Sequence, residues 1–284
     1  MDTKNGKTNN IYFPLCFLSY RECDTIAGED AEYIPGLSEI AGYILDYGVI
    51  EYGKKLWREN FFISQNDESQ IKSYARKNSF SSKSIQDKYI ILSCLKLGIR
   101  LGNMTLAKAL HEKLSLYLRE YESTYGKDVK VKIHKDILFE VRDKKFDERM
   151  FRVYCAVLSV IGNKNFVRIT IDTISFRMHG FKTSDIYLDN NLSYEVLTRR
   201  QTEITLAKLQ ERNFFRRFTY AKRVIYYSTK LSDEDLLNAI ADKIANAKFR
   251  KSKSKIANEV LTLKVKERHL ERLKEHETKL KNGK

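Results

Sequence analysis

The chain has 284 residues, 42% of them hydrophobic, which is enough for one large domain or two modest domains that each bury a core. Its formal net charge of +15 favours a polyanionic partner, with nucleic acid ahead of an anionic membrane surface. The polar start has no apolar signal segment and the apolar runs are too short to cross a bilayer, so we expect a cytoplasmic protein that does not enter membranes.

Residues 1–10 are polar and are expected to form a disordered tip. The apolar run over residues 11–20 fits either a buried strand or the start of a buried helix. Residues 21–36 are predicted to form a polar loop. With only 2 prolines and 12 glycines, the composition as a whole indicates a mainly helical fold.

A helical domain is predicted over residues 11–130. Apolar residues recur at spacings of three and four over residues 37–57, and two further amphipathic helices are expected over 85–102 and 104–126. In the last of these, a leucine stripe is predicted to face the core, formed by Leu106, Leu110, Leu114 and Leu118. Residues 64–84 are polar and show no clear period.

The second domain is predicted over residues 131–230. Residues 125–137 combine a glycine with alternating basic residues and are interpreted as a linker or as the lead-in to this domain. An apolar helix over 147–162 ends at a glycine. A short strand over 165–169, a second helix over 170–180 capped by Thr170, and a long polar connection follow.

Thr198 and Gln201 form a T-x-x-Q capping box, which predicts a helix that begins at Arg199. Four residues spaced as one helical face are expected to point inward: Thr202, Thr205, Leu206 and Leu209. Arg199, Arg200, Glu203 and Lys208 then point outward. Asn213 suits a left-handed helix end. Residues 214–218 and 223–228 alternate like two strands, joined by a basic turn.

This order of helix, strand, helix, capped helix, strand, basic turn and strand resembles a winged helix-turn-helix domain over residues 147–228. The fold class that it implies is mainly α with a small β-hairpin wing. In that family the third helix enters the DNA major groove with its N-terminal residues at base edges. The matching positions here are Arg199, Arg200, Thr202 and Glu203. The wing would contact phosphates or the minor groove through Tyr220, Lys222 and Arg223, with Arg216 and Arg217 on its strand.

Residues 231–284 are predicted to form a basic helical tail. A helix capped by Ser232 is expected over 231–247, and a dense basic cluster follows, formed by Lys248, Arg250, Lys251, Lys253 and Lys255. From residue 248 to the end there are 13 Lys and Arg against 5 Glu, so over half of the net charge lies here. Such a run can neutralise phosphates without reading sequence, although a solvated helix is an equally good interpretation.

No catalytic, metal-binding or cofactor-binding residue is predicted. The Gly-Lys-Thr at residues 6–8 lacks the rest of a P-loop, and the four cysteines and five histidines have no metal-site spacing. Three nearby carboxylates, Asp136, Glu140 and Asp143, could serve a metal nuclease, but in a highly charged chain they carry little weight.

We therefore expect a non-enzymatic protein that binds double-stranded DNA, in replication or regulation of a mobile element of the plasmid or phage kind. The alternative is a non-enzymatic RNA-binding, adaptor or assembly subunit whose basic tail binds nucleic acid within a larger complex. Residues 37–125 would mediate homodimer formation or contact a protein partner.

Overall fold

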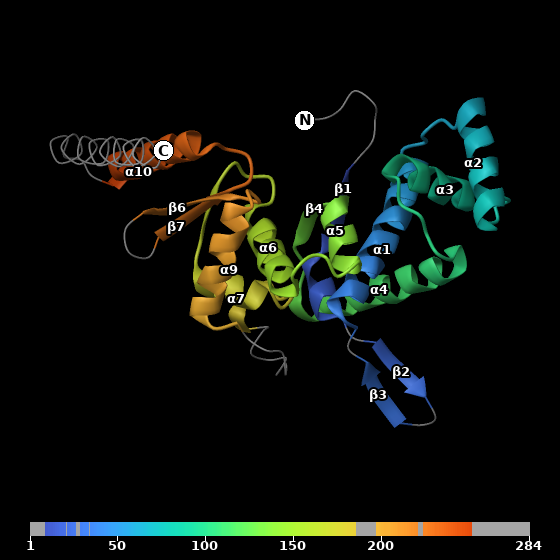
Figure 1. The fold of residues 1–284 in the computed structure, drawn as a ribbon, viewed down its shortest axis with the longest axis horizontal. Coiled ribbons are helices and arrows are strands. Elements are labelled where there is room, and N and C mark those ends of the chain that lie inside the picture. The colour runs from blue at the N-terminus through green and yellow to red at the C-terminus, as the bar shows by residue number, and fades with distance from the viewer. Residues whose placement is uncertain are drawn as a thin grey trace, which may run out of the picture. The chain divides into compact units, whose positions relative to one another are not determined.

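A computed structural model describes residues 9–20, 22–26, 29–33, 35–185, 197–220 and 224–251 (Figure 1). The described chain is mainly helical, as predicted, and its strands form small antiparallel sheets. Its contacts form two compact units, residues 1–162 with 170–212 and residues 163–169 with 213–284. This division differs from the predicted boundary at residue 130, which falls inside a strand of the first unit.

Helix α1 (Leu37–Arg58) is the centre of the first unit, and its predicted span is confirmed. It packs against α3 (Ile85–Leu97), α4 (Met104–Tyr125) and α5 (Lys135–Arg142). The approach to α3 is close at Gly53, where an added Cβ would lie 3.1 Å from the Ile90 Cα. Beside it, the buried Ser93 hydroxyl donates to the Val49 carbonyl at 2.7 Å.

Helix α2 (Gln65–Asn78) lies in the stretch for which no element was expected. Its start is a capping box in which the Asp67 N–H donates to the Ser64 hydroxyl, and the Asp67 carboxylate accepts from the Ser64 N–H at 3.0 Å. Only Ile71 and Ala75 are buried, one turn apart. Two apolar contacts are too few to produce a visible period, and the cap was the signal that could have revealed the helix.

Of the four leucines predicted to face the core from α4, only Leu114 is fully buried. Leu106 is 68% exposed, whereas the buried face is formed by Met104, Ala107, His111, Leu114 and Tyr121. In a helix with 3.6 residues per turn, residues four apart are offset by 40° around the axis. Residues at a constant spacing of four therefore drift away from any one face. Alternating steps of three and four keep the observed residues on the core side.

The predicted linker near residue 130 is part of the first unit. Strand β4 (Lys130–His134) pairs antiparallel with β1 (Asn10–Pro14), so that Tyr12 lies opposite Lys132. A 3-10 helix (Leu15–Ser19) continues the run after β1, and all five of its residues are buried. The first half of the apolar run is therefore a strand.

The expected polar loop at residues 21–36 holds a hairpin instead. Strand β2 (Glu22–Ile26) pairs antiparallel with β3 (Glu29–Tyr33). These segments are rich in acidic residues that are uncommon in strands, so the sequence carries little strand signal there.

Three more helices belong to the described part of the first unit. Helix α6 (Glu148–Ile161) is capped by Asp147 and ends at Gly162, and α7 (Ile171–Arg177) is capped by Thr170. Helix α9 (Arg199–Glu211) packs on both (Figure 1). The predicted caps of α7 and α9 and the glycine end of α6 are confirmed, whereas α7 ends at Arg177, three residues before the predicted stop at Gly180.

The second unit is a sheet covered by one helix. Strands β5 (Val167–Ile169), β7 (Val224–Ser228) and β6 (Arg216–Tyr220) lie in the order β5-β7-β6, all antiparallel. Leu236 and Ile240 of α10 (Asp233–Lys251) bury Tyr226 of the central strand. The predicted Ser232 cap is present, since its hydroxyl accepts from the Asp235 N–H at 3.1 Å.

Candidate nucleic-acid interface

Helix α9 begins with the predicted capping box. The Thr198 hydroxyl accepts from the Gln201 backbone N–H at 3.2 Å, and the Gln201 side-chain oxygen accepts from the Thr198 N–H at 2.8 Å. The reciprocal bonds set the helix start at Arg199. Arg199 and Arg200 therefore occupy the first turn, where the helix dipole favours anions.

The inner face of α9 is the predicted one: Thr202, Thr205, Leu206 and Leu209 are all buried. The Thr202 hydroxyl donates to the Thr198 carbonyl at 3.1 Å, and its residue is 0% exposed. The assignment of Thr202 as a base-contacting residue is therefore corrected. The same spacing that places Leu206 and Leu209 in the core also turns Thr202 inward.

The outer face of α9 exposes four predicted residues: Arg199, Arg200, Glu203 and Lys208. The Arg199 Nε lies 3.4 Å from the Glu203 Oε1, with side chains 68% and 50% exposed. An ion pair this exposed is weak, so Arg199 can readily exchange Glu203 for another hydrogen-bond acceptor. Ile204 lies on the same face and is 48% exposed, and it was not among the predicted site residues. Its position outside the inward stripe of α9 is the sequence signal that could have identified it.

The inner face and the C-terminal end of α9 are packed within the first unit. Leu206 and Leu209 are 0% exposed. At the other end of the helix, the Arg212 guanidinium lies over the Phe146 ring, 5.4 Å from its centroid, and its Nη1 is 3.9 Å from the Met150 sulfur. These contacts hold the exposed arginines of the first turn on a fixed helix rather than on a loop.

The predicted hairpin is present as β6 and β7, and Asn213 before it has the expected left-handed φ of 61°. Arg216 is already engaged inside the second unit, because it donates to the Asn213 side-chain oxygen and pairs with Asp233 at 3.7 Å. Arg217 is half-buried opposite Tyr227. Arg216 thus ties the hairpin to the start of α10.

Much of the predicted wing tip and tail lies outside the described residues. Lys222, Arg223, Lys253 and Lys255 belong to this part, as do the side chains of Tyr220, Lys248, Arg250 and Lys251. The described part of α10 adds one unpredicted cation: Lys243 Nζ lies 5.2 Å from the Phe166 ring centroid and 5.6 Å from that of Tyr226.

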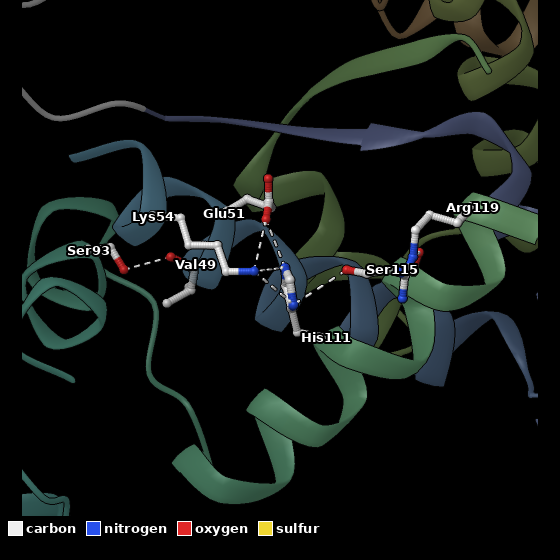
Figure 2. Close-up of polar contacts among 7 residues, drawn as sticks. All are labelled: Val49, Glu51, Lys54, Ser93, His111, Ser115 and Arg119. Carbon is white, nitrogen blue, oxygen red and sulfur yellow. Dashed lines mark hydrogen bonds and ion pairs between the residues drawn. The ribbon is translucent and has the colours of Figure 1, made fainter. Parts of the chain in front are cut away.

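A polar cluster joins α1 to α4 in the first unit (Figure 2). The His111 Nε2 lies 2.8 Å from the Glu51 carboxylate, and the Lys54 Nζ lies 3.3 Å from both ring nitrogens. The hydrogen bond to His111 lowers the pKa of Glu51. Ser115 is 3.5 Å from Nδ1, but the His111 ring is 3% exposed and stacks on Tyr47. The cluster therefore links α1 to α4 through hydrogen bonds between their side chains.

Several other reactive groups of the described residues are paired or buried. Asp136 lies 3.2 Å from the His134 Nδ1, and Asp143 lies 3.0 Å from the Arg142 Nε. Cys16, Cys94 and Cys155 are free and buried, and burial raises the pKa of each thiol, that of Cys94 to about 12. Such thiols are poor nucleophiles.

Among the residues that the structure describes, no group of three or more His, Cys, Asp or Glu side chains could hold a metal ion. Within the same described ranges, no helix is long and apolar enough to cross a membrane.

No protein-family model matches the chain, and neither a curated protein nor a solved structure is detectably similar to it.

Proposed function

We propose that this protein binds double-stranded DNA through the exposed face of α9, in the manner of a winged helix. The observation that supports the proposal most is the order α6, β5, α7, α9, β6, β7, in which the last described helix before the hairpin exposes two arginines in its first turn. The net charge of +15 supplies the long-range attraction to a polyanion.

Each exposed side chain of α9 has a role in this proposal. Arg199 and Arg200 each donate two parallel hydrogen bonds, to a guanine edge or to a phosphate. Glu203 accepts from a cytosine amino group, and Ile204 contacts a thymine methyl group. Lys208, two turns further along, pairs with a backbone phosphate. The basic residues of the hairpin turn and the tail add contacts that do not read sequence.

The test is fluorescence anisotropy of the full chain on labelled duplex DNA, single-stranded DNA and RNA hairpins over a salt titration. We expect the double variant Arg199→Ala/Arg200→Ala to weaken duplex binding by about 10- to 100-fold, since a good base contact contributes about 1–3 kcal/mol. The slope of log affinity against log salt should also become shallower.

A matched control removes the same charge elsewhere. Arg76 and Lys77 are adjacent, exposed and at the end of helix α2, as Arg199 and Arg200 are at the start of α9. The Arg76→Ala/Lys77→Ala variant should change duplex affinity only by its effect on net charge. Equal losses in the two double variants would refute recognition by α9, and a preference for RNA hairpins over duplex DNA would support the adaptor or RNA-binding alternative.

A further inference from the structure

The two-stranded ribbon of β1 and β4 has one buried and one exposed face. Ile11 and Phe13 alternate with Tyr12, and Val131 and Ile133 alternate with Lys130 and Lys132. All four apolar residues are at most 2% exposed and form part of the core of the first unit. On the inner side Ile11 packs so closely on α1 that a Cβ at Gly48 would lie 2.6 Å from it.

The exposed face carries an aromatic ring on one strand and two lysines on the other. Tyr12 is 51% exposed, although it sits in the middle of its strand. Lys132 is its direct cross-strand neighbour, with Nζ 5.7 Å from the ring centroid, and Lys130 is exposed two residues before it. In Figure 1 the two strands run side by side.

Two carboxylates close in sequence to these lysines are engaged with other groups. Asp128 is only 8% exposed, and its Oδ2 accepts from the buried Cys16 N–H at 2.8 Å. Asp136 faces His134 at 3.2 Å. The exposed face therefore presents two ammonium groups beside a ring that can stack, and neither ammonium group forms an ion pair within the described residues.

We propose that this face of β1 and β4 binds unpaired nucleic acid, with a base stacked on Tyr12 and phosphates paired with Lys130 and Lys132. Aromatic rings on a basic sheet surface bind single strands because every base has a flat face and every nucleotide a phosphate. Duplex DNA keeps its base faces covered by stacking, so it cannot use the ring in this way. The proposal does not depend on α9.

The experiment measures anisotropy of labelled oligo(dT) and oligo(U) of about 20 nucleotides, longer than a typical single-strand site. Tyr12→Val keeps a strand-forming residue and removes the ring, and we expect it to weaken single-strand binding about tenfold, the loss of one stacked base. Tyr12→Phe should retain the wild-type affinity. Lys130→Gln/Lys132→Gln should weaken binding and reduce its salt dependence. The two oligonucleotides show whether DNA or RNA is preferred.

Matched controls lie elsewhere on the first unit. Phe62→Val removes an aromatic residue that is 82% exposed, and Lys77→Gln/Lys83→Gln removes two exposed lysines. Neither control should lower single-strand affinity beyond the effect of net charge. Single-strand affinity that is unchanged in Tyr12→Val, or that falls equally in Phe62→Val, would overturn the proposal.

A direct readout uses the variant Tyr12→Trp combined with Trp57→Phe, which moves the single tryptophan of the chain to the ribbon. Stacking should quench its fluorescence with oligo(dT) and leave it unchanged with duplex. Loss of duplex binding in the α9 variant with intact quenching would separate this site from the proposed function. An unquenched indole in a protein that binds oligo(dT) would place the single strand elsewhere.

Discussion

Asp46 of α1 offers a sharp test of how the first unit is packed. Burial raises the pKa of its carboxyl from the ordinary 3.8 to about 6, although the Arg142 charge on α5 acts in the opposite direction. Above pH 6 the folded protein therefore holds a charged carboxylate in an unfavourable site. We expect Asp46→Asn, which has nearly the same shape and no charge, to stabilise the unit at neutral pH.

The magnitude follows from proton linkage. A pKa raised from 3.8 to about 6 corresponds to about 3 kcal/mol, at 1.36 kcal/mol per pH unit. Between pH 4 and 6 the folded state binds the proton and the unfolded state does not, so acid removes the penalty in the wild type. The advantage of Asp46→Asn should therefore be largest above pH 6 and should decline toward pH 4.

The assay is urea unfolding followed by the fluorescence of Trp57, the single tryptophan, which lies on the same helix as Asp46. Free energies of unfolding of wild type and variant are compared at pH 7.5 and pH 4. The difference between the two pH values is the decisive quantity, because any cost of packing the asparagine amide is common to both.

Glu112→Gln is the control, since Glu112 is an exposed carboxylate on α4. Its effect on the free energy of unfolding should be small at both pH values. A stability difference between Asp46→Asn and wild type that stays constant from pH 7.5 to pH 4 would show that burial does not perturb this carboxyl and would refute the reasoning.

Two further predictions concern helix packing and the α9 face. Gly53→Ala should destabilise the first unit by about 1–3 kcal/mol in urea unfolding, because the new methyl would lie 3.1 Å from the α3 backbone. Gly42→Ala on the same helix, with nothing within 4 Å, should instead gain up to about 1 kcal/mol, and a gain at both positions would contradict the close approach. Glu203→Gln should release Arg199 and strengthen binding to random duplex DNA by about two- to fivefold in anisotropy titrations, as expected for a weak exposed pair. Weaker binding to every duplex would show that the pair with Glu203 does not restrain Arg199.

Features encoded within a few residues were predictable from the sequence. The Thr198–Gln201 box, the Asp147 and Thr170 caps and the left-handed Asn213 all use hydrogen bonds or backbone preferences over one turn. The inward stripe of α9 was predictable for the same reason. Applying that stripe consistently would also have excluded Thr202 from the exposed face.

Features that depend on distant partners were not predictable. Basic alternation near residue 130 was interpreted as a linker, and only the pairing of Ile133 with Ile11 makes it a strand. The engagement of Arg216 by Asp233 likewise requires α10 to begin beside β6.

The sequence by itself determined where most helices begin and that the chain is strongly basic, because caps, periodicity and charge are local or additive. The tertiary structure decided which of these charges are available. It left Arg199, Arg200, Lys130 and Lys132 exposed, turned the Asp128 carboxylate inward and held Arg216 within its own unit. Burial and ion pairing depend on what other segments cover, and no local pattern records that.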